Sequence, residues 1–455
     1  MKKKMVKFIS CYGKYLILFV FFFLCLHFFY TDFYGDQIYN FGFSYAVSRG
    51  EIPYRDFNMI VPSFGAYFYA IAFLLFNTNL IIFNLFQAFL LCILFFFLFQ
   101  LYGKKASFLL IVLCIPVGVA FASIMYQGYN FLLLLELVIL LYLEKNHKSD
   151  YIIGFIVGIC FLTKQTVGFC LLLPSLYYLF KKREKFVKRI LGFFIPCVIF
   201  LIFLLVTGTV QAFFDLCFLG MFDFTKSNGR IMDYNSILFL IGIIFVISRI
   251  IKDRTRMDYY YILAFSSIAI PLFDYYHVAL FVFSCTFLLL DYISVTYHTL
   301  FLHSFILAVV LVLTWVGFSR NFQFYLSKFH HFEYQVITKQ GEESIQEINQ
   351  YIKQNRHTKI IILSANSYYL KICNDMDITY YDLLNYGNHG YHGTWKMIQR
   401  LKDEEDALVI INRKEYQIHN RDRQQLNKEV LEYAMDRFPL IKKIGNYNIY
   451  RVSID

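Results

Sequence analysis

The feature that most constrains this chain is a succession of apolar runs separated by short basic clusters. A chain of 455 residues with 58% hydrophobic and 16% charged residues does not have the composition of a soluble protein. A membrane-spanning helix needs roughly 20 residues, so a span built on one of the shorter runs must include flanking aromatic residues or tilt little. The runs that could cross a bilayer are 15–30, 80–101, 106–122, 130–143, 190–207, 236–250, 259–273, 277–296 and 300–318.

The charge pattern favours a membrane rather than a nucleic acid as partner. The net charge is +11, but the lysines and arginines gather between apolar runs, which is how positive charge sets membrane topology. The ten cysteines are scattered and show no metal-binding spacing. The basic start MKKKMVK and the following apolar run lack a small-residue cleavage site, so we predict an uncleaved first span.

The basic clusters also predict the topology, because they should all lie on the cytoplasmic side. This condition leaves 62–76 as a juxtamembrane helix on the outer face and makes 151–180 a hairpin that enters and leaves on the inner side. The prediction is a helical polytopic bundle of about eleven crossings in the cytoplasmic membrane. The clusters used are Lys2–Lys7, Lys104–Lys105, Lys145–Lys148, Lys181–Arg189 and Arg249–Arg256.

The predicted hairpin has arms too short to cross the bilayer. Each arm of about 13 to 15 residues is about 20 Å long as a helix, against roughly 30 Å of hydrocarbon. Its turn, Thr163 to Thr166, therefore lies below the outer surface and carries Lys164, the one charge in this apolar stretch. An ionisable group at such a depth is a functional candidate, with snorkelling to the surface as the alternative.

From Asn321 the composition becomes that of a soluble protein, which predicts two domains, 1–320 in the membrane and 321–455 outside the cytoplasm. The patterns predict helices at 341–356, 394–401 and 422–437, and buried strands at 359–363 and 407–412. The final LIKKIGNYNIYRV has Gly-Asn between apolar runs, which is typical of a hairpin. We expect a small α/β domain with parallel strands.

The stretch 36–62, DQIYNFGFSYAVSRGEIPYRDFNMIVP, is the first polar segment after the first span and concentrates ionisable groups. Its pattern is Asp-x-x-Tyr, an amphipathic helix-length segment, and then Arg-Gly-x-x-Pro-Tyr-Arg-Asp-Phe. This resembles the first outer loop of polytopic GT-C glycosyltransferases, the superfamily of protein mannosyltransferases and lipid A aminoarabinose transferases. The likeness extends more loosely over about two thirds of the chain.

The resemblance implies transfer of a sugar from a polyprenyl-phosphate donor, with Asp36 facing the acceptor as catalytic base. Asp36 could instead be an ordinary helix cap, and Asp32 is the rival carboxylate. Arg55 and Arg49 are candidates to bind the donor phosphates through their guanidinium groups, with a lipid-headgroup anchor as the alternative. Related sequences carry a lysine in a comparable short hairpin, and this adds Lys164 to the candidate phosphate-binding residues.

Sugar or acceptor binding is predicted for a second set of polar residues near the outer face: Tyr126, Gln127, Asn130, Asp274 and His277. The 126–130 loop carries amides and phenols where many relatives carry an acidic motif. Amides are poor ligands for a divalent ion unless carboxylates join them, so no metal ligand set is predicted and the cofactor stays unknown.

The predicted function is an integral membrane glycosyltransferase whose acceptor is a cell-surface glycan, a teichoic acid or a lipid. A transporter or flippase for lipid-linked saccharides is the alternative from another class, although a transporter should show two halves with matching broken helices. A polymerase of surface polysaccharide would use the same donors, but it would be expected to carry a large outer loop between spans.

Overall fold

The computed structural model describes residues 2–26, 36–76, 78, 80–119, 128–228, 234–270, 273–296, 342–365, 367–419 and 427–452. The chain forms two compact units. The helical unit comprises Met1–Thr31, Ala72–Val198 and Ile231–Gln335, and the mixed unit comprises Asp32–Ile71, Ile199–Arg230 and Val336–Asp455. The mixed unit thus joins two earlier segments to the predicted C-terminal domain.

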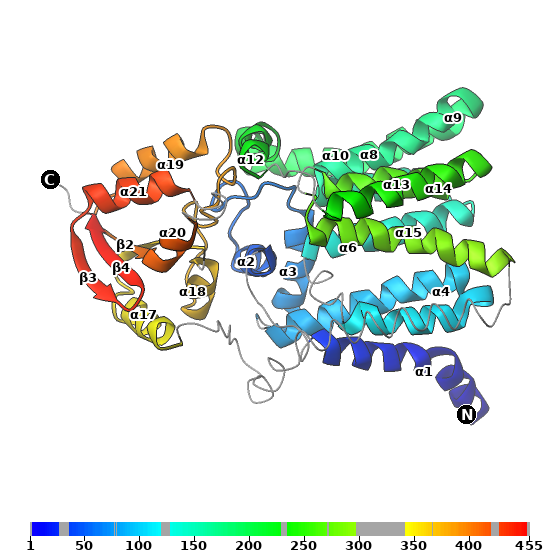
Figure 1. Ribbon diagram of the computed structural model, residues 1–455, viewed down its shortest axis with the longest axis horizontal. Coiled ribbons are helices and arrows are strands. Elements are labelled where there is room, and N and C mark those ends of the chain that lie inside the picture. The colour runs from blue at the N-terminus through cyan, green and yellow to red at the C-terminus, as the bar shows by residue number, and fades with distance from the viewer. Residues whose placement is uncertain are drawn as a thin grey trace. The chain divides into compact units, whose positions relative to one another are not determined.

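The helical unit consists of apolar helices, shown in Figure 1. Its elements are α1 (Lys2–Leu24), α4 (Leu80–Val119), α6 (Gly128–Lys145), α7 (Asp150–Thr163), α8 (Gln165–Leu172), the 3-10 turn η2 (Leu173–Ser175), α9 (Leu176–Lys181), α10 (Arg183–Val206, whose last turns belong to the mixed unit), α13 (Tyr234–Lys252), α14 (Met257–Phe265), the 3-10 turn η4 (Ser266–Ala269) and α15 (Tyr275–Thr296).

Three of the described helices are long and apolar enough to cross a membrane, namely Ile81–Gly103, Arg183–Val206 and Asn235–Lys252. The predicted number of about eleven crossings therefore stays a prediction, and the run 300–318 lies outside the described residues. Helix α4 covers the predicted run 80–101, the basic pair Lys104 and Lys105, and most of the predicted run 106–122. Lysine has a high helix propensity, so a basic cluster need not end a helix.

The predicted hairpin at 151–180 is confirmed as two packed helices that meet at Lys164. Lys164 ends α7 and precedes α8 with an extended backbone, at φ −153° and ψ 113°. Gly168 on α8 lies directly against α7, since a Cβ built there would fall 2.1 Å from the backbone nitrogen of Phe161. A larger residue at this position would force the two arms apart.

A buried arginine ties four helices of the helical unit together. The Arg189 side chain is 1% exposed and pairs with Glu144 and Asp150, each at 2.8 Å. It also donates to the Tyr261 hydroxyl at 2.9 Å. These partners lie on α6, α7 and α14, while Arg189 lies on α10. Removing one partner of such a pair leaves a buried charge uncompensated, which typically costs about 3 to 5 kcal/mol.

The mixed unit combines helices with one four-stranded sheet. Its elements are α2 (Asp36–Ser48), α3 (Phe64–Phe76, which continues into the helical unit), α11 (Val210–Phe214), a π-helical turn (Asp215–Leu219), α12 (Gly220–Asn228), α17 (Glu342–Gln354), β1 (Lys359–Leu363), α18 (Ser367–Cys373), α19 (Gly393–Lys402), β2 (Ala407–Asn412), α20 (Arg413–His419), α21 (Lys428–Arg437), β3 (Leu440–Ile444) and β4 (Tyr447–Val452).

The sheet has the strand order β1-β2-β4-β3. Strands β1 and β2 are parallel, with Lys359 opposite Ala407, and β4 runs antiparallel to both β2 and β3. The predicted strands at 359–363 and 407–412 and the C-terminal hairpin are therefore confirmed. The hairpin turns at Gly445, whose φ of +52° favours glycine.

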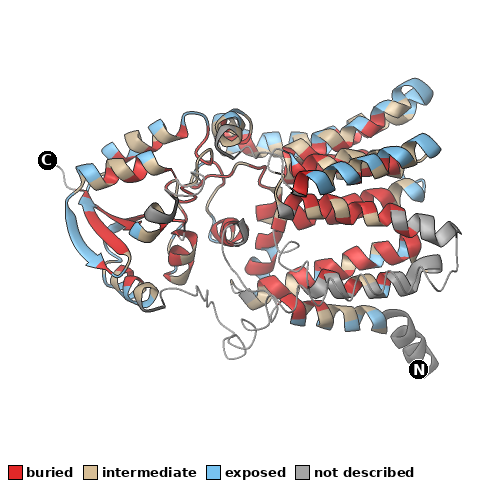
Figure 2. Ribbon diagram, in the orientation of Figure 1, coloured by how far each residue is buried: buried red, intermediate tan, exposed pale blue. Residues whose placement is uncertain are grey.

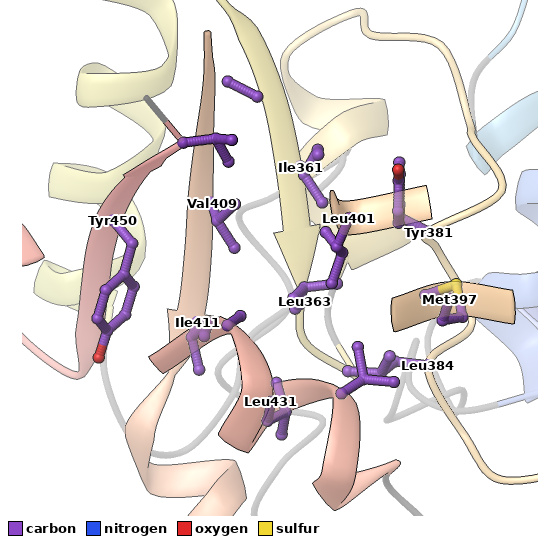
Figure 3. Close-up of a cluster of buried hydrophobic side chains, with 14 of the residues drawn as sticks. Ile361, Leu363, Tyr381, Leu384, Met397, Leu401, Val409, Ile411, Leu431 and Tyr450 are labelled. Atoms are coloured by element: carbon purple, nitrogen blue, oxygen red, sulfur yellow. The ribbon is translucent and has the colours of Figure 1, made fainter. Parts of the chain in front are cut away.

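Alternating side chains of the sheet build two apolar cores. On one face, β1 and β2 residues such as Ile361 and Val409 pack with Met397 and Leu401 of α19 and with Leu431 of α21 (Figure 3). On the other face, the cluster is Ile348, Ile352, Ile360, Ile362, Leu370, Leu408, Ile410, Ile444, Tyr447 and Ile449. Figure 2 shows the edge strand β3 mostly exposed, in contrast to the buried β2. The period of two follows from the pleat of a strand covered on both faces.

Candidate functional site

Asp36 is the first residue of α2, as the sequence predicted, and its side chain lies outside the described residues. A carboxylate at a helix N-terminus is stabilised by the helix dipole and by unpaired backbone N–H groups. The catalytic assignment of Asp36 stays a prediction.

Helix α2 is held against α18 by close aromatic packing. A Cβ built on Gly42 would lie 2.0 Å from Cδ1 of Tyr368, so only glycine lets the ring approach the helix this closely. The Tyr368 ring also packs edge-on against Tyr39 and Phe43, with centroids 5.1 and 5.8 Å away. The helix that begins at the predicted catalytic residue is therefore positioned by residues near the far end of the chain.

Arg49 follows α2 and is engaged by two carboxylates of the mixed unit. Its guanidinium group lies 2.5 Å from Asp375 and 3.0 Å from Asp377. Tyr45 adds a hydrogen bond from its hydroxyl to Asp375 at 3.3 Å. The structure thus gives Arg49 partners inside the protein, and its assignment to the donor phosphate stays untested.

Glu51 lies beside this ion-pair group. Its Oε1 accepts a hydrogen bond from the Ile378 amide at 3.3 Å. Burial, and next the negative charge of Asp377, raise the pKa of Glu51 to about 8. The carboxyl group is therefore protonated over most of the acidic and neutral range.

Arg55 binds the neighbouring Asp56 through two hydrogen bonds, from Nε at 3.0 Å and from Nη2 at 3.1 Å. Asp56 also accepts from the Ile52 amide at 2.7 Å. Such a two-point pair fixes the guanidinium plane. The Arg55 side chain is 53% exposed, and its donor-phosphate assignment also stays a prediction.

In the helical unit, the break between α7 and α8 fixes Lys164. Its Nζ donates to the Ile268 carbonyl at 3.3 Å and lies 6.0 Å from the centroid of the Tyr129 ring. The preceding Thr163 hydroxyl donates to the buried Glu136 at 2.7 Å. Glu136 lies within the apolar sequence LLLLELVILL of α6. The structure shows that it connects α6 to the hairpin turn.

Three of the residues predicted to bind sugar or acceptor lie together. Asp274 Oδ1 accepts from both the backbone amide and Nδ1 of His277, at 2.9 and 2.8 Å. With the proton on Nδ1, Nε2 becomes an acceptor toward the Asn130 amide at 3.4 Å. His277 is 1% exposed. Tyr126 and Gln127 lie outside the described residues.

No cluster of three or more His, Cys, Asp or Glu side chains suited to a metal ion occurs in the part of the chain that the structure describes.

The chain shares its fold with solved structures over nearly its whole length. The crystal structure of ArnT from Cupriavidus metallidurans bound to undecaprenyl phosphate matches with a TM-score of 0.60 and 12% identity, over 97% of this chain and 98% of that one. The apo state of the same protein matches with a TM-score of 0.57, 12% identity and the same coverage.

An Archaeoglobus fulgidus oligosaccharyltransferase, solved with Zn and sulfate, matches at a TM-score of 0.44 and 9% identity over 88% of this chain and 68% of that one, too distant to carry an argument. No family model matches the chain, and no curated protein matches it. The predicted resemblance in fold is confirmed, and at 12% identity it concerns the fold alone.

Proposed function

We propose that this protein is an integral membrane glycosyltransferase that moves a sugar from a polyprenyl-phosphate donor to an extracytoplasmic acceptor. The observation that carries the proposal is the shared fold, over nearly the whole of both chains, with a protein solved with undecaprenyl phosphate. The predicted site residues add chemistry suited to this reaction. The acceptor is a cell-surface glycan, a teichoic acid or a lipid.

Asp36 acts in this proposal as the general base. It takes the proton of the acceptor hydroxyl while that oxygen forms a bond to the anomeric carbon of the sugar. The bond between this carbon and the phosphate oxygen breaks, and the configuration inverts. The base must be ionised at the moment of transfer, and a carboxylate with an ordinary pKa meets this condition at neutral pH.

Lys164 stabilises the leaving phosphate, which gains negative charge as the bond breaks. Its support is the extended backbone between α7 and α8, which places a cation in an otherwise apolar hairpin. We keep Arg49 and Arg55 as further phosphate ligands to be tested. Each already has a carboxylate partner, so a phosphate must compete with that partner.

Asn130, Asp274 and His277 bind hydroxyl groups of the sugar or acceptor in this proposal. Their connected hydrogen bonds support a fixed orientation of the imidazole. Tyr126 and Gln127 complete this set. The enzyme lies in the cytoplasmic membrane with about eleven crossings, and residues 321–455 lie outside the cytoplasm.

The test is binding of undecaprenyl phosphate to the purified full chain, measured by native mass spectrometry. Lys164→Ala should weaken binding by roughly 10-fold to 150-fold, since a hydrogen bond to a charged group contributes about 1.5 to 3 kcal/mol. Undecaprenol, which lacks the phosphate, should bind both proteins equally. Lys148→Ala removes an exposed lysine between α6 and α7 and serves as the matched control.

Equal binding of undecaprenyl phosphate to the wild type and Lys164→Ala would remove Lys164 from the phosphate site. Absence of any phosphate-dependent binding to the wild type would contradict the proposed donor. A turnover assay with a radiolabelled undecaprenyl-phosphate sugar then tests the transfer itself.

A further inference from the structure

The mixed unit contains a cavity of about 410 Å³ whose lining includes Arg55, one of the three candidate phosphate ligands, but neither Arg49 nor Lys164. Cavities of about 300 to 1,000 Å³ hold small-molecule ligands in proteins. Four segments of the unit form its walls: the loop after α2, the start of β1, the Thr379–Tyr381 segment, and the end of α19 with the residues that follow it. Its charged lining residues are Arg55, Asp56, Lys359, Arg400, Asp403 and Glu404.

We propose that this cavity binds an uncharged sugar unit of the acceptor. The lining holds three cations and three carboxylates, so its formal net charge is zero. The three carboxylates would repel a phosphate or carboxylate ligand, and the three cations would repel an ammonium ligand. A hydroxyl group avoids this conflict because it both donates and accepts hydrogen bonds. A polyhydroxylated, uncharged ring therefore fits the lining best.

Several of the lining groups are held in place by one another. Arg55 binds Asp56 through two hydrogen bonds, and Lys359 pairs with Glu404. Glu404 also accepts a hydrogen bond from the Tyr381 hydroxyl at 2.6 Å. A ligand that meets groups already fixed loses less free energy in ordering them, so a fixed lining favours binding.

Arg400 and Asp403 are the lining groups best placed to engage a ligand. The Arg400 guanidinium carbon lies 3.4 Å from the centroid of the Tyr380 ring, so the ring holds the guanidinium group. The other four charged residues of the lining form two ion pairs, whereas Arg400 and Asp403 form none with the residues that the structure describes. Together they supply one donor group and one acceptor group at the end of α19, as adjacent sugar hydroxyls require.

This inference rests on the proposed function, in which an acceptor glycan outside the cytoplasm supplies the uncharged sugar unit. Arg55 and Asp56 lie in the loop that follows α2, and α2 begins at the proposed base Asp36. The cavity thus belongs to the unit that contains the proposed catalytic residue.

The test uses the detergent-purified full chain on a printed array of neutral, phosphorylated and uronic-acid oligosaccharides, followed by solution titration with the strongest neutral one. We expect neutral oligosaccharides to bind. Arg400→Gln and Asp403→Asn should each weaken this binding by about tenfold or more, because each removes hydrogen bonds to a charged group. Lys443→Gln, on the exposed edge strand β3, is the matched control and should bind as the wild type does.

Binding only to phosphorylated or uronic-acid glycans, or no binding to any glycan, would overturn the proposal. Neutral-sugar binding that survives in both variants would place the site elsewhere and overturn it as well. Binding of undecaprenyl phosphate, measured in parallel, separates the two proposals, because Arg400→Gln should leave this binding unchanged while it weakens binding of the neutral oligosaccharide.

Discussion

Gly42→Ala tests whether the packing of α2 against α18 positions the proposed catalytic helix. The new Cβ would lie 2.0 Å from Cδ1 and 2.6 Å from Cε1 of Tyr368, whereas carbon atoms in contact prefer about 3.5 to 4.0 Å. The ring must therefore recede by about 1.5 Å. Its freedom is small because it is 1% exposed and is held by Tyr39 and Phe43.

Overpacking of this kind typically costs about 1 to 3 kcal/mol. Alanine is about 1 kcal/mol more favourable than glycine inside a helix, which offsets part of the cost. We therefore expect a net destabilisation of up to about 2 kcal/mol, and a fall in Tm of about 2 to 4 °C for each kcal/mol in a unit of this size. The assay is thermal unfolding of the purified protein followed by intrinsic fluorescence.

A second substitution at the same contact provides the control. Tyr368→Leu removes the ring that Gly42→Ala would meet, so the double variant should be less destabilised than the sum of the two single variants, by about 0.5 to 3 kcal/mol. Transfer activity should fall in Gly42→Ala and partly recover in the double variant, because Asp36 begins the same helix. A raised Tm in Gly42→Ala, or additive effects of the two single substitutions, would show that α2 does not pack on Tyr368.

Three further predictions follow from the site and the topology. Asp36→Asn keeps helix-capping ability but cannot accept a proton, so transfer should fall about 100-fold or more with little change in Tm, while Asp32→Asn is milder; the reverse ranking would make Asp32 the base. Because the pKa of Glu51 is raised to about 8, the folded state holds a proton that the unfolded state releases, and stability should fall as pH rises from about 4.5 to 8. Glu51→Gln should reduce this slope in Tm against pH, and an unchanged slope would refute the assignment. Single cysteines at Glu347 and Arg183, in a background without reactive native cysteines, should label from outside the cell at Glu347 only; labelling at Arg183 would contradict the predicted topology.

The membrane class and several local elements could be predicted from the sequence because they depend on local hydropathy and periodicity. The hairpin at 151–180 followed from the requirement that the basic clusters lie on one side of the membrane, and the parallel strands followed from short apolar runs in a polar region. The extent of α4 through Lys104 and Lys105 was not predicted from the apolar runs, because a basic cluster places no requirement on where a helix ends.

The sequence by itself thus predicted a helical membrane protein with a small α/β region and a short list of candidate residues. Only the tertiary structure decided which partners these residues meet. Arg49 pairs with Asp375 across 326 positions of the chain, and Asn130 and His277 lie 3.4 Å apart across 147 positions. The cavity at Arg55, Lys359 and Arg400 likewise joins three distant segments. Such contacts depend on which apolar surfaces pack together. A sequence pattern identifies an apolar surface, but it does not identify the surface that it packs against.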